Sequence, residues 1–371
     1  MAPIAEAESV FDIETNLSLW WVLLEQNQNG IEQAGSGDPA EEAASGFAIK
    51  QGRIILAYED TDYHVGAYAQ VRLEERVAIL DLYGMWKPVN WFNFYAGQMK
   101  IPSTYEVLTK DECLDFVTRT TISKYIADYS LSRTPYLSSF WGNRSYYRDT
   151  GIAFKGAVGP ESNRQLLQYF LMISNGLGAG VYIGGPESKE NVTSNKFGDY
   201  FYGLRMDVNP IKWVTIGGHY SINKHDDMLL GDGKTVLDLD RSSWSADLRF
   251  EIPYLRVVGM YGAGEIDEKY YMISTDHFDY SGWEAKALAQ VWKDHMEVGV
   301  RYDNYIFGET ATEHEIEQNN WTFGVNYTPV PAMRLQLNYM VKDTDNGIDS
   351  DVDDDLLVLN FQFIFGAQKS K

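Results

Sequence analysis

Hydrophobic and polar residues alternate with a period of two along most of the chain. In residues 356–365 (LLVLNFQFIF), every odd position is Leu or Phe, whereas the even positions include Asn360 and Gln362. Successive side chains of a strand point to opposite faces, so this period predicts a β-strand with one apolar and one polar face. Similar segments recur from one end of the chain to the other, and together they predict an all-β protein.

The connections between these segments fall into two classes that take turns along the chain. One class is short and often contains proline, as in WKPVNW (86–91) and TPVPAM (328–333). The other class is usually longer, polar and acidic, as in residues 175–198 and 343–355. Successive connections of an up-and-down meander lie at opposite ends of the sheet. The regularity therefore predicts short turns at one end and long loops at the other, the pattern of outer-membrane barrels.

Counting the alternating segments gives about sixteen antiparallel strands, an even number that leaves both termini at the short-turn end. The expected strands are residues 8–26, 47–59, 62–74, 77–87, 91–100, 149–158, 165–174, 198–208, 211–222, 241–252, 254–263, 282–292, 294–304, 319–328, 332–342 and 356–365. The sequence thus predicts a single up-and-down transmembrane β-barrel over residues 1–371, with the last strand ending at Phe365.

The composition favours a membrane β-barrel over a soluble β-sandwich. Aromatic residues make up 14% of the chain, with 25 Tyr and 10 Trp, and several end the apolar faces, as at Tyr302 and Trp321. Such rings are expected at membrane–water interfaces. If the apolar faces meet lipid, the charged faces of the same strands point into a water-filled lumen. A soluble sandwich would show the same period with its apolar face inward. No window of 18 or more apolar residues exists, so a helical membrane protein is excluded.

Charge and chemistry narrow the function further. The net charge of −22 argues against nucleic acid as a partner, and the single Cys113 excludes an internal disulfide. The start, MAPIAEAES, lacks the basic and apolar regions of a signal peptide and is interpreted as that of a mature chain. The six histidines form no His-x₃-His pair, and no nucleophile motif appears, so no enzyme is expected. A barrel hydrolase using His219 and Ser221, which share one strand face, is the alternative.

Residues 101–148 form the one long segment without clear alternation. A structureless loop of that length is rare in a compact domain unless it has a function, and a barrel of about sixteen strands has a wide lumen. We expect this third loop to fold inward and constrict the pore. Apolar residues from Leu114 to Ile126 recur at mixed three- and four-residue spacing, which predicts a short helix within it.

Three stretches resemble the phosphate-selective porin O and P family. They are FAIKQGRIILAYEDTDYHVGAYAQVRL (47–73), FYAGQMKIPSTYEVLTKDECLDFVTRTTISKYI (94–126) and RDTGIAFKGAVG (148–159), so the clear resemblance covers residues 47–159. It implies a sixteen-stranded homotrimeric porin of the bacterial outer membrane, in contact with its lipid, with a basic eyelet and a ladder of cations that guides anions. Carried onto this chain, the eyelet candidates are Lys110, Arg119, Lys124 and Arg133, and the ladder candidates are Arg53, Arg72, Lys155, Arg249, Arg301 and Arg334.

The predicted function is a passive channel for small hydrophilic solutes, with anions such as phosphate or organic acids favoured by a charged eyelet. Carboxylates share the inward faces, so a weakly selective or cation-preferring porin stays open, as does a structural barrel that houses a partner. No cofactor is expected. The acidic loop 343–355 resembles an oxygen-rich Ca²⁺ loop, with Asp345, Asp349 and Asp351 as ligand candidates, although a solvated loop is the simpler reading.

Overall fold

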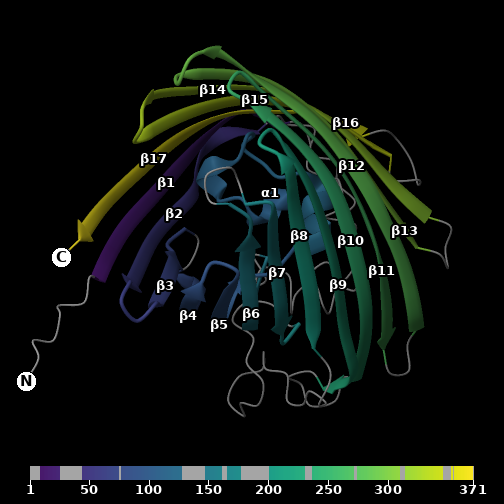
Figure 1. Cartoon of the computed structure of the whole chain (residues 1–371). Helices are drawn as coiled ribbons and strands as arrows, with labels where there is room; N and C mark the ends of the chain where they lie inside the picture. Colours follow the sequence, from purple (N-terminus) through teal and green to yellow (C-terminus); the bar gives the residue numbers. More distant parts are fainter. Residues whose placement is uncertain are drawn as a thin grey trace, which may run out of the picture.

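The chain forms one closed antiparallel sheet in a computed structural model (Figure 1). The structure describes residues 9–25, 44–74, 77–127, 147–160, 165–176, 200–229, 236–270, 274–309, 314–345, 352–353 and 355–370. Within these residues no helix is long and apolar enough to cross a membrane.

Sixteen long strands build the wall in the described part of the chain. They are β1 (Ser9–Glu25), β2 (Ala44–Asp60), β3 (Val65–Arg72), β4 (Ala78–Val89), β5 (Phe92–Lys100), β6 (Arg148–Val158), β7 (Leu167–Ser174), β8 (Phe201–Ile211), β9 (Val214–Leu229), β10 (Val236–Ile252), β11 (Leu255–Tyr270), β12 (Ser274–Trp292), β13 (Met296–Glu309), β14 (His314–Val330), β15 (Met333–Asp345) and β17 (Leu356–Ser370). A two-residue strand, β16 (Val352–Asp353), pairs with β15. The predicted fold class and the sixteen segments are confirmed.

The barrel closes where the two ends of the chain meet. Thr15 of β1 pairs with Ile54 of β2 on one side and with Phe365 of β17 on the other. The first and last strands therefore lie side by side, at the left of Figure 1. The predicted end of the last strand is wrong, because β17 continues beyond Phe365 to Ser370, whose backbone pairs with Val10.

Several strands are longer than the sequence predicts. The pattern placed residues 264–281 in a loop, yet β11 runs to Tyr270 and β12 begins at Ser274. A strand needs only about 9–11 residues to cross the hydrocarbon, and β12 has 19. Backbone pairing continues beyond the membrane, where the outward face has no reason to be apolar. Alternation of apolar residues marks only the part of each strand that meets lipid.

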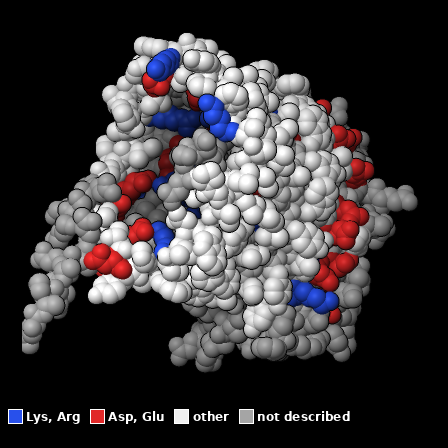
Figure 2. Space-filling view, in the orientation of Figure 1, with Lys and Arg blue, Asp and Glu red and all other residues white. Residues whose placement is uncertain are grey.

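The two faces of the wall are inverted relative to a soluble protein. On β10, Trp244 and Leu248 are exposed, whereas Ser245 and Asp247 between them are buried. On β17, Asn360 and Gln362 point inward and are buried, while Phe365 is exposed. The broad middle of the wall is free of charged side chains in Figure 2, and charges gather at a hollow on the left and along the right edge. The predicted assignment of faces is confirmed.

A band of aromatic rings crosses the outer face of β10–β14. Ring centroids of Trp244 and Tyr261 lie 5.4 Å apart, those of Trp283 and Tyr302 4.9 Å, and those of Tyr302 and Trp321 4.8 Å. The register places these residues at nearly the same height, since Tyr261 pairs with Trp283 and Tyr302 with Trp321. Such a girdle is typical of one hydrocarbon boundary of an outer-membrane barrel.

A cation placed on the lipid face should destabilise the barrel. Leu248 lies four residues from the girdle residue Trp244 and six from Tyr254 in the short turn, so it is near the middle of the hydrocarbon. We expect Leu248→Arg to lower the free energy of unfolding by about 2–4 kcal/mol, measured by urea titration in lipid vesicles. Gln168→Arg, which adds the same charge at a cavity-lining position on β7, is the control and should change it little.

Candidate functional site

The long loop between β5 and β6 is described over residues 101–127, and this part lies inside the barrel. It contains α1 (Tyr105–Leu108), the 3₁₀ turn η1 (Asp111–Cys113) and α2 (Thr121–Ala127). The hydroxyl of Thr104 caps α1 by accepting a hydrogen bond from the amide of Val107 at 3.3 Å. The predicted short helix is present as α2. We call residues 101–127 the inner loop; residues 128–146, with the eyelet candidate Arg133, lie outside the described residues.

Apolar packing holds α2 against the inner face of the wall. Ile122 and Ile126 are fully buried against an inward-facing apolar patch. This patch consists of Met260, Ile266, Phe278, Tyr280, Tyr305 and Phe307, on β11, β12 and β13. Apolar residues on the lumen side of a water-filled barrel would be unfavourable if they were wet, and the inner loop covers them.

Glycines on the inner face let the inner loop approach the wall closely. A Cβ built on Gly262 of β11 would overlap the side chain of Ile126. On Gly324 of β14 it would lie 2.9 Å from the ring of Phe116, and on Gly203 of β8 it would lie 2.6 Å from Pro102. Any larger residue at these positions would displace the inner loop toward the lumen axis.

Arginines of the wall hold the carbonyl groups of the inner loop. Arg301 donates to the carbonyl of Thr118 at 2.7 Å, and Arg205 donates to that of Ser103 at 3.2 Å. Arg334 donates to the carbonyls of Glu112 and Leu114 at 3.1 and 2.9 Å. Two of the predicted ladder residues, Arg301 and Arg334, therefore contact the inner loop directly.

A buried charge cluster joins α1 to the wall. The Glu106 carboxylate lies 3.6 Å from Lys286 Nζ and 3.8 Å from Arg301 Nη1, and it accepts a hydrogen bond from the amide of Thr120 at 2.9 Å. Burial alone would raise the pKa of Glu106, but these two cations and the amide outweigh it and lower the pKa to about 2. Lys286 also pairs with Asp115 at 3.1 Å. The inner loop is thus fixed by buried ion pairs as well as by apolar contacts.

The eyelet candidates in the described residues differ in what they touch. Arg119 is folded into the inner loop, where it pairs with Asp111 and donates to the carbonyl of Thr109 at 2.9 Å. Lys124 lies on α2, and burial, followed by the nearby charges of Lys50 and Arg301, lowers its pKa to about 8. Lys110 is half exposed and lies 3.6 Å from Glu14 and 3.5 Å from Glu112.

The remaining ladder candidates all lie on the inner face, in different surroundings. Arg53 pairs with Glu74, and Arg249 contacts Asp207 at 2.6 Å and Asp247 at 2.9 Å. Arg72 is buried on β3. Lys155 of β6 is different, because its Nζ lies over the rings of Phe170 at 4.1 Å and Tyr95 at 4.8 Å. No carboxylate of the described residues lies within 4 Å of this ammonium.

Six carboxylates on the inner face of the wall pair with arginine. Asp81 receives two hydrogen bonds from Arg148, both at 2.9 Å. The other such pairs are Glu74 with Arg53, Asp207 and Asp247 with Arg205 and Arg249, Asp303 with Arg301, and Glu297 with Arg256. The mixed signs that the sequence places on the inner face therefore largely cancel in pairs.

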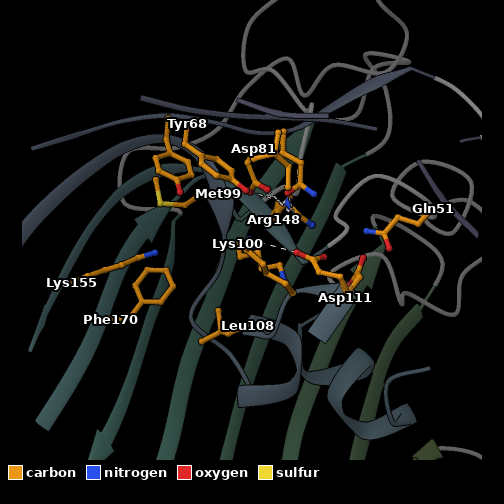
Figure 3. Close-up of a pocket in the computed structure, with 15 residues that line it drawn as sticks. Gln51, Tyr68, Asp81, Met99, Lys100, Leu108, Asp111, Arg148, Lys155 and Phe170 are labelled. Carbon is orange, nitrogen blue, oxygen red and sulfur yellow. Dashed lines mark hydrogen bonds and ion pairs between the residues drawn. The ribbon is translucent and has the colours of Figure 1, made fainter. Parts of the chain in front are cut away.

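Two cavities lie between the inner loop and the opposite wall, and they share Leu108, Lys155 and Phe170. The first, of about 290 Å³, is lined by β2–β7 and the tip of the inner loop (Figure 3). The second, of about 630 Å³, extends to the turn residues His64 and Asn90 at the short-turn end. The two cavities adjoin at these shared residues, and we call the first cavity the eyelet.

Sequence reasoning missed part of the eyelet. The missed lining residues include Lys100, Arg148, Tyr68, Tyr83 and Phe170. Arg148 and Lys100 flank the inner loop in sequence and pair with each other in the β5–β6 ladder. The rings occupy inward positions, a signal that the sequence contains but that we assigned to no role.

Comparison with known proteins agrees with this geometry. The family model "Phosphate-selective porin O and P" matches residues 268–365, about a quarter of the 371 residues. The predicted family resemblance is thus confirmed, although the match lies in the C-terminal strands rather than in residues 47–159, where the sequence resemblance was clearest. A search of curated proteins finds no significant match.

Solved structures of outer-membrane channels share the fold at low sequence identity. The anion-selective porin from Comamonas acidovorans has a TM-score of 0.62 at 11% identity, covering 97% of this chain and 100% of its own. OmpT of Vibrio cholerae has 0.61 at 11%, covering 96% and 98%, and the DcaP channel of Acinetobacter baumannii has 0.60 at 12%, covering 98% and 99%. The chain has the fold of an outer-membrane porin. The predicted location of the porin in the bacterial outer membrane is confirmed.

The described residues give little support for two other predicted sites, the calcium site and the Ser/His hydrolase site. Asp345 ends β15, whereas Asp349 and Asp351 lie outside the described residues, so the calcium site stays a prediction. The Ser221 hydroxyl lies 2.7 Å from that of Ser243, and no hydrogen bond joins it to His219 in the described part of the chain. The fold is shared with solved outer-membrane channels.

Removing the carboxylate of Glu106 should weaken the attachment of the inner loop of the porin. Because its pKa is lowered, the ionised group stabilises the folded state above the unfolded value of about 4.3, and this contribution is lost as the pH falls toward about 2. We expect Glu106→Gln to lower the free energy of unfolding by about 3–5 kcal/mol at pH 5.

The measurement is urea unfolding of wild type and variant at pH 5, 4 and 2.5, read as the difference between them. That difference should shrink below about pH 4.3. Glu315→Gln, an exposed carboxylate on β14, is the matched control and should show no difference. A Glu106 difference that is as large at pH 2.5 as at pH 5 would contradict the assignment.

Proposed function

We propose that this porin is a passive diffusion channel for small hydrophilic solutes, that residues 101–148 form its constriction, and that it favours anions. The observation that carries the proposal is the ammonium of Lys155, which lies where the two lumen cavities meet. A fixed cation at the narrow part of an aqueous pore raises the local concentration of anions and lowers that of cations. The anion-selective porin of Comamonas acidovorans shares the fold, which adds support.

The carboxylates that face the eyelet are each close to a cation, which is also consistent with a preference for anions. Asp81 is held by Arg148, Asp111 by Arg119, and Glu112 accepts from Asn16 and lies near Lys110. Four basic side chains and three carboxylates line the cavity. This balance supports a modest preference rather than a strong phosphate filter, since the paired arginines add little net field.

Lys155→Gln should weaken the preference for anions. A unit charge at about 4 Å in water changes the free energy of an ion by about 1 kcal/mol, so the Cl⁻/K⁺ permeability ratio should fall about three- to fivefold. The measurement is the reversal potential of the porin in a planar bilayer across a KCl gradient.

Lys212→Gln is the matched control. Lys212 also lies over a ring, with Nζ 4.6 Å from the centroid of Trp213, but it is in an exposed turn rather than in a cavity. It should leave the reversal potential unchanged, and Lys155→Arg should retain most of the preference. A wild-type channel that prefers K⁺ would overturn the anion proposal, and the absence of conductance would overturn the channel.

We propose further that the porin assembles as a homotrimer through the outer face of β2–β4. This face carries strongly exposed apolar side chains, including Phe47 and Ile49 on β2 and Ile79 on β4. Strand β3, in the middle of this face, is only 8 residues long, whereas β9–β12 are 16–19 residues long. A low, apolar side of a barrel is suited to contact with a second copy. A structure of the Vibrio cholerae OmpT is described as a trimer form.

Ile49→Asn should weaken such a trimer, because it places an unpaired amide in the apolar contact. The mass of the detergent-solubilised protein, measured by sedimentation with correction for detergent, should shift from three chains toward one. Ile216→Asn on β9, another exposed isoleucine of the wall, should leave the mass unchanged. A wild-type mass of one chain would exclude the trimer, and equal behaviour of the two variants would exclude this face.

A further inference from the structure

One side of the eyelet is lined by aromatic rings rather than by the polar residues usual in an aqueous lumen. Tyr68 on β3, Tyr83 on β4 and Phe170 on β7 all line it. Ile55 and Met99, on β2 and β5, add apolar surface between them. Tyr68 and Tyr83 keep part of their surface exposed to the cavity, whereas Ile55, Met99 and Phe170 are buried behind them.

The rings form a connected array that ends at the cation. Tyr68 and Tyr83 are stacked with centroids 5.1 Å apart, and Tyr83 meets Tyr95 edge-on at 5.8 Å. Lys155 Nζ lies over Tyr95 and Phe170, at the end of this row. Figure 3 shows Lys155 beside Phe170, with Tyr68 and Met99 on the same side of the cavity. A flat apolar surface and a positive charge are therefore presented together.

The polar side of the eyelet is already occupied by its own contacts. Arg148 uses two donors on Asp81, and Lys100 donates to the carbonyls of Val107 and Thr109 at 2.7 and 2.9 Å. Of the lining cations, Lys155 alone has no oxygen partner among the described residues. A volume of about 290 Å³ suits a solute with one small ring rather than a large one.

We propose that the eyelet is a subsite for small aromatic carboxylates, which rests on the anion preference proposed above and names its substrate class. The carboxylate of the solute contacts the Lys155 ammonium, and its ring lies against Tyr68, Tyr83 or Phe170. Inorganic phosphate can use only the first of these contacts. Ring–ring contact adds about three- to tenfold in affinity beyond burial of the same area.

The experiment compares sodium benzoate, cyclohexanecarboxylate and acetate as blockers of chloride current through single channels of the full-length protein. Benzoate and cyclohexanecarboxylate have the same charge and nearly the same size, but only benzoate has a π-face. We expect half-block by benzoate at a concentration about three- to tenfold lower than by cyclohexanecarboxylate. Acetate, which has no ring, should block least.

Two variants test the assigned residues. Tyr68→Leu and Phe170→Leu keep apolar bulk and remove one ring each, so each should bring the half-blocking concentrations of benzoate and cyclohexanecarboxylate closer together. Tyr202→Leu, which removes an exposed ring from the outer face of β8, is the matched control and should behave as wild type. Phe170 is packed against the inner loop, whereas Tyr68 is outside that cluster, so a folding defect in one variant leaves the other informative.

The outcomes separate this inference from the function on which it rests. Equal block by benzoate and cyclohexanecarboxylate in wild type, or full benzoate preference in both leucine variants, overturns the aromatic subsite while the anion preference stands. A reversal potential in a sodium acetate gradient that reports preference for Na⁺ overturns the anion preference itself.

Discussion

Lipid offers no hydrogen-bond partner to a backbone, and every other feature of this porin follows from that constraint. A strand that crosses hydrocarbon has to pair on both sides, which requires the sheet to close on itself. Here closure depends on β1, which pairs with both β2 and β17. Once the sheet is closed, alternation sends one set of side chains to lipid and the other to the lumen. The inverted burial of Leu248 and Asp247 is the direct consequence.

A lumen wide enough for sixteen strands needs to be filled in part before it can select anything. The inner loop does this, and the wall is built to receive it. Gly203, Gly262 and Gly324 remove side chains where the inner loop approaches, and Arg301 and Arg334 hold its carbonyls. Arg205, Lys286 and Arg301 each pair with a carboxylate, which limits the penalty for taking these charges out of water. The inner loop is therefore packed against the wall as part of the fold.

The sequence was sufficient to predict which strand faces meet lipid. It was insufficient to predict which side chains contact one another inside the barrel or where strands end outside the membrane. Asn360 and Gln362 could be assigned to the lumen because their neighbours have to be apolar. The start of β12 at Ser274 could not be predicted, because backbone pairing outside the membrane leaves no apolar pattern. Lys155 and Arg301 look alike in sequence, as single cations at inward positions. Only the folded chain distinguishes them, since Arg301 is covered by the inner loop and Lys155 faces the two cavities.

The identity of the unpaired cation matters for transport. Arginine presents a planar fork that binds a carboxylate or two carbonyls with fixed geometry, which suits Arg148 and Arg334 to structural roles. The Lys155 ammonium is a compact point charge on a flexible chain, and in the described part of the structure the rings of Tyr95 and Phe170 steady it. It can attract an anion without a fixed set of hydrogen bonds that the anion would have to break on leaving. Conduction needs binding that is favourable but weak, and a lysine against an aromatic surface meets both requirements.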